Sequence, residues 1–177
     1  MHFQNEICRI DIEVAMYTLE SADNKHYDLV YNPGNYRRGD YYNTLAIHVD
    51  TFFSEYSIAL VGSYVTFGAD CVILDESFLT ILQDYTITQI NVIDGSLVLY
   101  RKLRDFSGVS YGIYKVQDGY IVYGELEIVM LDLEFNEKWN FLARDIITSF
   151  EIAETTIKLS DWNNNHYEID FNGKSAS

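Results

Sequence analysis

Hydrophobic residues occur in short runs along this chain, and polar residues separate the runs. From Ile10 to Met16 every second residue is apolar, and Asp11, Glu13 and Ala15 occupy the positions between. Side chains of a strand point alternately to its two faces, so this pattern predicts a β-strand with one face in water. Later runs, about four to six residues long and rich in Val, Ile, Tyr and Phe, are also typical of strands.

Turn residues divide the remaining runs into hairpins. Asn32-Pro33-Gly34-Asn35 is a strong turn signal because proline fixes φ and glycine accepts a positive φ. The same reasoning predicts turns at Asp94-Gly95, Asp118-Gly119 and 163–165. Further strands are predicted at 27–31, 45–49, 57–60, 156–160 and 166–171. Helix is expected to be scarce, with one short turn near Asp50 to Tyr56.

A segment in the second half of the chain resembles an earlier segment. Tyr120 to Gly124 matches Tyr64 to Gly68, and Leu131-Asp132 matches Leu74-Asp75. The offset grows from about 56 to about 60 residues, and a period in this range is typical of a repeated supersecondary unit. We therefore predict a single all-β domain over 1–177, with a diverged sheet at 1–62 and repeat units, each a small sheet, at 63–118 and 119–173.

The later repeat contains the segment Leu131 to Phe141, in which a strand ending in Leu-Asp meets a turn and then a strand with Trp139 and Phe141. This segment resembles the repeat of PQQ-like β-propellers. The resemblance implies blade-like antiparallel hairpins. It implies no quinone, because quinone-binding residues are not matched, and we expect no cofactor. A propeller needs at least about four blades, so we expect an open or sandwich-like packing of antiparallel sheets. We predict that Trp139 and Phe141 belong to the core.

The chain is strongly acidic, with 27 Asp and Glu against 12 Lys and Arg and a formal net charge of -15. Nucleic-acid binding needs a basic footprint, so the one basic cluster, Arg101-Lys102-Leu103-Arg104, does not predict that function. No apolar run is long enough to span a bilayer, and the N-terminus lacks a signal-peptide pattern. We therefore expect a cytoplasmic protein without a membrane partner, in which Cys8 and Cys71 are buried, reduced thiols.

No familiar catalytic or metal-binding motif is present. The four histidines lack zinc-site spacing, and no serine stands in a nucleophile elbow. Asp161 to Asn165 begins like a calcium loop, but His166 stands where the loop needs glycine and Asn172 where it needs glutamate. The segment is therefore interpreted as a polar hairpin tip, and no metal is predicted.

One loop combines aromatic rings with a guanidinium group, in Tyr36, Arg37, Tyr41 and Tyr42. These side chains can stack on sugars, bases or the side chains of a protein partner. The alternative interpretation is a loop edge that packs down on the sheet.

Two pairs of acids are spaced two residues apart, Glu125 with Glu127 and Glu168 with Asp170. This spacing predicts that each pair lies on one face of a strand. Paired carboxylates hydrolyse glycosides in many enzymes, but in a chain this acidic a solvated strand face is the better interpretation. We retain these four residues as candidates for contact with a partner.

These observations favour a non-enzymatic cytoplasmic binding module whose acidic surface engages and neutralises a basic protein. In general character the chain resembles small acidic bacterial immunity proteins. The alternative hypothesis is a carbohydrate-binding or carbohydrate-hydrolysing β domain. A binding module predicts an acidic surface without a deep pocket, whereas a hydrolase predicts a cleft with two convergent carboxylates.

Overall fold

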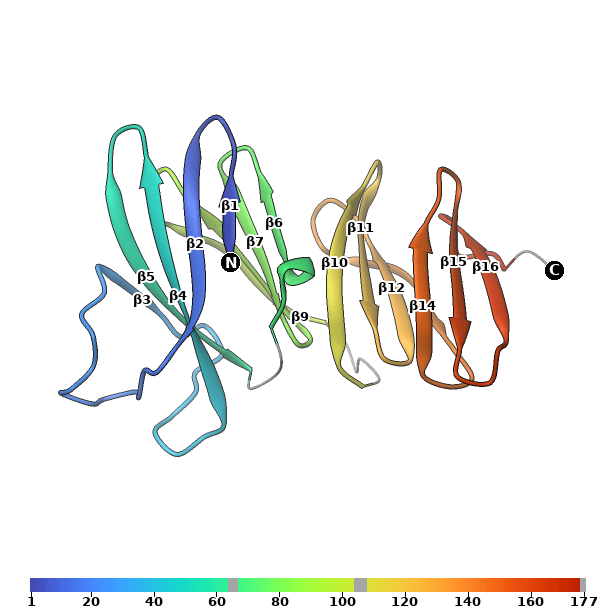
Figure 1. Cartoon of the computed structure of the whole chain (residues 1–177), viewed down its shortest axis with the longest axis horizontal. Helices are drawn as coiled ribbons and strands as arrows, with labels where there is room; N and C mark the ends of the chain where they lie inside the picture. Colours follow the sequence, from blue (N-terminus) through green and yellow to red (C-terminus); the bar gives the residue numbers. More distant parts are fainter. Residues whose placement is uncertain (64–66, 104–107, 176–177) are drawn as a thin grey trace. The chain divides into compact units, whose positions relative to one another are not determined.

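The computed structural model describes residues 1–63, 67–103 and 108–175, and these residues form β-strands joined by turns (Figure 1). Within them, the helical structure consists of one short 3-10 helix, η1 (Ala69–Cys71). The prediction of an all-β chain with little helix is confirmed. The helical turn predicted near Asp50 to Tyr56 is wrong, because these residues form the tip of a β-hairpin. No helix of the described residues has the length and apolarity to cross a membrane.

The chain divides into two compact units, Met1–Lys102 and Leu103–Ser177. The first unit contains a five-stranded sheet of order β1-β2-β4-β5-β3 and a four-stranded meander. In the five-stranded sheet β3 pairs parallel with β5, and the other pairs are antiparallel. Its strands are β1 (His2–Gln4), β2 (Cys8–Ala15), β3 (Leu29–Tyr31), β4 (Tyr42–Thr51) and β5 (Glu55–Ser63). The meander consists of β6 (Val72–Asp75), β7 (Phe78–Gln83), β8 (Thr86–Asn91) and β9 (Leu97–Lys102).

The two sheets of the first unit pack face to face around an aliphatic core. Ile10 from β2, Ile47 from β4 and Ile81 from β7 are all fully buried in the same cluster. Burying one such side chain contributes about 1.5–3 kcal/mol. The alternation predicted for Ile10 to Met16 holds through Ile12 and then ends, since Val14 is 56% exposed. The sandwich-like packing is therefore confirmed inside this unit.

The second unit contains two further antiparallel meanders. The first has the strands β10 (Ser110–Val116), β11 (Gly119–Gly124), β12 (Glu127–Leu131) and β13 (Glu137–Leu142). The second has only β14 (Ile147–Ile152), β15 (Thr156–Asp161) and β16 (His166–Asp170). The turn between β10 and β11 requires glycine, because Gly119 has φ +149° and a Cβ there would overlap the carbonyl oxygen of Leu131. The last predicted hairpin is confirmed, with Thr156 opposite Asp170.

Aromatic side chains complete the core of the second unit. Trp139 and Phe141 on β13 pack against a buried cluster that includes Ile128 and Ile157. The indole Nε1 of Trp139 donates a hydrogen bond of 3.0 Å to the carbonyl oxygen of Phe171. The ring of Phe141 lies edge-on to that of Tyr167, with 5.1 Å between the centroids. Trp139 and Phe141 are partly buried and pack against the buried cluster, so the prediction that they are core residues is confirmed in part.

One turn geometry recurs three times in the second unit. Asp132 directly follows β12, and Asp161 and Asp170 are the last residues of β15 and β16. The Oδ1 of each aspartate accepts hydrogen bonds from the backbone N–H groups two and four residues later. The residue three positions after each aspartate has a positive φ, at Phe135, Asn164 and Gly173. After all three turns the register is also the same, because Leu131 pairs with Glu137, Ser160 with His166 and Ile169 with Ser175.

The sheet boundaries differ from the predicted repeat boundaries. Leu74-Asp75 and Leu131-Asp132 do occupy equivalent places, at the ends of β6 and β12. However, β6 is the first strand of its sheet, whereas β12 is the third. The match of Tyr120 to Gly124 with Tyr64 to Gly68 is tested only in part, because 64–66 lie outside the described residues. The repeat thus relates hairpins, and it does not mark out sheets.

Candidate binding surface

The loop between β3 and β4 is held in shape by its own side chains. Asn32 Nδ2 donates to the carbonyl oxygen of Tyr36 at 2.8 Å, and the backbone N–H of Tyr36 donates to Asn32 Oδ1 at 3.0 Å. The backbone N–H of Arg37 donates to Asp40 Oδ2 at 2.7 Å. The turn predicted at Asn32 to Asn35 is confirmed, since Asn35 has φ 56° and its N–H bonds to the Asn32 carbonyl oxygen.

The three candidate tyrosines of this loop have different roles. The rings of Tyr36 and Tyr42 lie 6.0 Å apart, and Tyr42 Oη accepts a hydrogen bond of 2.7 Å from the backbone N–H of Leu19. Burial, with smaller contributions from neighbouring groups, raises the pKa of Tyr36. Tyr41 is 88% exposed, and Arg37 is exposed as well. Tyr41 and Arg37 are therefore the two members of this predicted set that are open to a partner.

The first predicted acid pair does not lie on one strand face. Glu125 occupies the bend between β11 and β12, while Glu127 is the first residue of β12. Glu127 is 4% exposed, and Asn140 Nδ2 donates to its Oε1 at 3.4 Å. The predicted face is wrong because the chain bends just before β12 begins. A binding role for Glu125 remains a prediction.

The second pair, Glu168 and Asp170, does share one face of β16, but the two carboxylates differ in their partners. Thr156 Oγ1 donates to Glu168 Oε1 at 2.9 Å. Asp170 Oδ1 accepts hydrogen bonds from the backbone N–H groups of Lys174 and Asn172. These bonds lower the pKa of Asp170, and the bond from Lys174 has the larger effect. Asp170 therefore organises a turn, and Glu168 is the member of the pair that stands on the exposed face.

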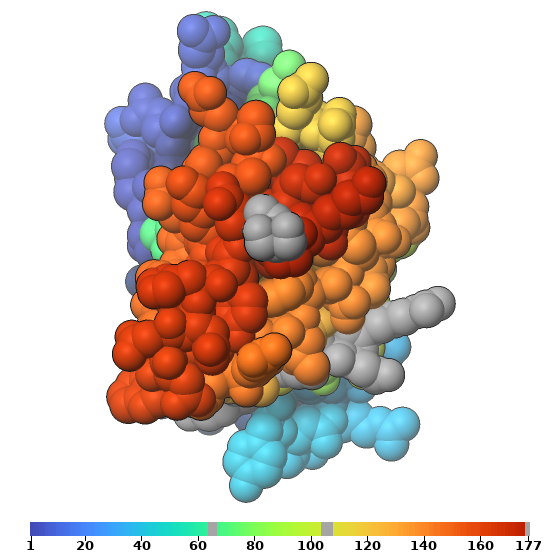
Figure 2. Space-filling model, turned by 90° about the vertical axis from the view of Figure 1, so that its right-hand side faces the viewer, coloured from blue at the N-terminus to red at the C-terminus, as the bar shows by residue number. Residues whose placement is uncertain are grey.

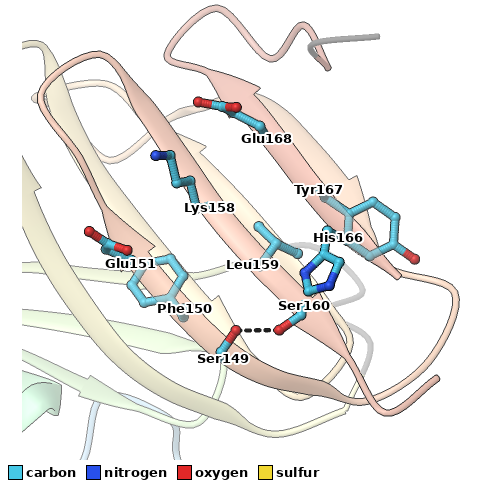
Figure 3. A pocket seen from close by; sticks show the side chains of 9 residues that line it. All are labelled: Ser149, Phe150, Glu151, Lys158, Leu159, Ser160, His166, Tyr167 and Glu168. Carbon is cyan, nitrogen blue, oxygen red and sulfur yellow. Dashed lines mark hydrogen bonds between the residues drawn. The ribbon is translucent and has the colours of Figure 1, made fainter. Parts of the chain in front are cut away.

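Glu168 belongs to a shallow hollow of about 610 Å³ on the outer face of the last sheet (Figure 3). Ser149, Ser160 and His166 lie side by side on β14, β15 and β16, and the two serine hydroxyls are hydrogen-bonded. The neighbouring row is formed by Glu151, Lys158 and Glu168. Figure 2 looks onto the orange and red atoms of these strands.

The two carboxylates of this hollow do not converge on one point. Glu151 and Glu168 stand on the outer strands with Lys158 between them (Figure 3). Adjacent strands are about 4.8 Å apart, so the acids are separated by roughly twice that distance. The arrangement offers hydrogen bonds and mixed charges to a ligand. Sequence reasoning found only Glu168 here, although the predicted pairing of 156–160 with 166–171 already placed Lys158 opposite it.

The Asp161 turn uses its carboxylate within the protein. Asp161 accepts hydrogen bonds from the backbone N–H groups of Asn163 and Asn165 and from Tyr167 Oη. Burial opposes ionisation of this carboxyl, but the hydrogen bonds outweigh it and lower the pKa of Asp161. In the described ranges, no group of three or more His, Cys, Asp and Glu residues is placed to hold a metal ion.

The most exposed aromatic side chains in the described part of the first unit were not anticipated. Phe52 and Phe53 form the tip of the β4–β5 hairpin and are 91% and 89% exposed. Their sequence signal was the run Thr51-Phe52-Phe53-Ser54 between two strands. A helical turn was predicted there instead.

Comparisons with known proteins identify no family. No protein-family model matches the chain, and no curated protein matches it. Among solved structures, a form of Hsv2 from Kluyveromyces lactis with loop 6CD replaced by a Gly-Ser linker is similar at a TM-score of 0.48 and 8% identity, over 78% of this chain and 49% of that one. The structure of Kluyveromyces lactis Hsv2p is similar at 0.46 and 7%, over 76% and 46%. The chain thus spans about half the length of these proteins, and a likeness this weak carries no inference about function.

Proposed function

We propose that the chain is a non-enzymatic cytoplasmic binding module, immunity-like in character, that engages a basic protein through its acidic surface. One observation carries the proposal. Asp50 on β4 lies directly opposite Glu55 on β5, and both side chains are exposed. Like charges opposite each other destabilise a sheet, so the isolated fold gains nothing from this pair. A cationic partner would remove that repulsion.

One cation, Arg9, lies beside the pair and offsets its charge only in part. Arg9 on β2 is the neighbour of Asp50 on the other side of the strand, but within the described parts of the chain it forms no ion pair with Asp50. With a formal net charge of -15, the protein attracts a positive partner over a distance and speeds the encounter. Tyr41 and Arg37 in the β3–β4 loop, and Glu168 on the last sheet, are further contacts that the proposal includes.

The carbohydrate hypothesis has less support. A glycoside hydrolase needs two carboxylates on either side of one bond. Glu151 and Glu168 are instead divided by Lys158 on an open sheet face (Figure 3). The residues of this hollow suit contact with a partner surface better than chemistry on a sugar.

The proposal is tested with the double variant Asp50→Asn, Glu55→Gln. Loss of the repulsion should raise the free energy of unfolding by about 0.2–1 kcal/mol. The same variant should associate more slowly with a basic protein captured from cells, and the wild-type rate should fall steeply between low and physiological salt. Urea unfolding and surface plasmon resonance measure the two effects.

Glu137→Gln with Glu154→Gln is the matched control, because it removes the same charge from two exposed acids that are not paired with each other. The control should leave the free energy of unfolding nearly unchanged. It should also lower the association rate less than the Asp50→Asn, Glu55→Gln variant does. A wild-type association rate that is indifferent to salt, or a captured partner that is acidic, would contradict the proposal.

A further inference from the structure

The tip of the β4–β5 hairpin is a rigid turn that presents two phenylalanines. The backbone N–H of Thr51 donates to the carbonyl oxygen of Ser54 at 2.8 Å, which closes the turn around Phe52 and Phe53. Thr51 Oγ1 accepts the backbone N–H groups of Ser54 at 3.0 Å and Phe53 at 3.3 Å. The two ring centroids are 5.2 Å apart with an interplanar angle of 78°. The rings are therefore held against each other on a fixed support.

Nothing in the fold accounts for aromatic residues at this tip, which is called the aromatic tip below. Tight turns favour glycine, asparagine and aspartate, which adopt the backbone geometry easily and are well solvated. Phe52 and Phe53 are instead about nine-tenths exposed, at 91% and 89%. Ile7, which precedes the Cys8 that pairs with Thr51, is 36% exposed and extends the apolar surface. Exposed apolar groups gathered in this way mark interaction sites.

Acidic residues stand directly behind the aromatic tip. Asp50 and Glu55 are the first pair of the hairpin below the turn. An apolar projection with two carboxylates at its base fits a pocket that is apolar inside and basic at its rim. An anionic membrane surface would repel the carboxylates, and a second copy of this chain would bring the same two acids close together.

We propose that the aromatic tip is the anchor of the interface, and that it inserts into an apolar pocket with a basic rim on a protein partner. This inference rests on the proposed function and names the surface through which it acts. Buried aromatic side chains at the centre of an interface carry much of its affinity. The hydrogen-bonded turn that carries them limits the backbone entropy lost on binding.

The test compares three full-length proteins against the basic protein captured by the wild type. Phe52→Ser with Phe53→Ser should weaken the affinity by about 30-fold or more, mostly through faster dissociation. Trp162→Ser is the control, because Trp162 is an exposed aromatic residue, 71% accessible, on the turn between β15 and β16. It should change the affinity by less than about threefold. A benzophenone amino acid placed at position 52 should crosslink to apolar residues of the partner.

The outcomes separate the inference from the function on which it rests. If the phenylalanine variant keeps wild-type affinity for the basic partner, the inference is overturned and the proposed function stands. If the wild type binds no basic protein, both fail. Crosslinking of position 52 to a second copy, or loss of vesicle binding in the variant with phosphatidylcholine and phosphatidylserine vesicles, would also overturn the inference in favour of self-association or a membrane.

Discussion

Two groups of aromatic residues, one in each unit, have opposite environments. Trp139 and Phe141 in the second unit alternate along β13 and pack against a buried cluster. Phe52 and Phe53 in the first unit are adjacent in a turn and almost fully exposed. Because neighbouring residues of a tight turn lie beyond the paired strands, neither side chain of the turn can reach the core between the sheets. Position in the hairpin, and not residue type, decides which aromatic residues stabilise the fold.

The largest effect that tests this comparison is expected at Trp139. Trp139→Ala should lower the free energy of unfolding by about 3 kcal/mol, because it removes a large partly buried side chain and its hydrogen bond to Phe171. Gly173 lies so close to the indole ring that any side chain at position 173 would be strained. Urea unfolding followed by circular dichroism measures the change.

Trp162→Ala is the matched control, because this side chain is 71% exposed. It should change the free energy of unfolding by less than about 0.5 kcal/mol. Equal effects of the two substitutions would mean that the packing of Trp139 contributes little.

A smaller effect is expected from Tyr56, an aromatic residue of the first unit that lies in a strand. Tyr56 Oη donates to the carbonyl oxygen of Val92 at 2.7 Å, and burial, with the Asp94 carboxylate, raises the pKa of Tyr56 to about 12. Above pH 10.0, the ordinary pKa of tyrosine, the unfolded chain loses this proton while the native chain keeps it. The free energy of unfolding should therefore fall as pH rises from 10.0 toward about 12, by about 1 kcal/mol after allowance for partial exposure.

Denaturant titrations at several alkaline pH values measure this fall. Tyr56→Phe should remove this part of the pH dependence. A slope unchanged by Tyr56→Phe would contradict the assignment of this fall to the Tyr56 phenol.

The smallest effect is expected at the aromatic tip itself. Phe52→Ser with Phe53→Ser should change the free energy of unfolding by no more than about 0.5 kcal/mol, because both side chains are solvated in the native state and the turn is closed by Thr51 and Ser54. Thermal melting of the variant beside the wild type measures it. A loss of unfolding free energy as large as that of Trp139→Ala would mean that the aromatic tip stabilises the fold. The contrast between the two groups of aromatic residues would then be wrong.

Local pattern was enough to predict much of the fold. Strand character, the turns at 32–35, 94–95, 118–119 and 163–165, and the core placement of Trp139 followed from short-range periodicity and turn chemistry. The parallel pairing of β3 with β5 did not follow, because it joins segments about thirty residues apart and leaves no local trace. The sheet boundaries were not predicted correctly either, because similar hairpins occupy different places in their sheets.

The candidate site was less predictable for a related reason. Glu125 and Glu127 were predicted to share a strand face, but a bend that the spacing does not reveal separates them. Tyr42 was chosen as a contact residue, yet its hydroxyl supports Leu19, a partner 23 positions away. Phe52 and Phe53 were missed because a short helical turn was predicted near Asp50 to Tyr56. Only the pairing of Asp50 with Glu55 shows that they form a tip.

The order of the strands in each unit has a consequence for the speed of folding. In the second unit every sheet is a meander, so each strand finds its partner next to it in sequence. In the first unit β5 pairs with β3 across the whole of β4, and β2 pairs with β4 across β3. Low contact order speeds folding, since less chain entropy is lost before the contacts form. The second unit should therefore reach its native sheets first during refolding, and closure of the five-stranded sheet should set the slowest rate.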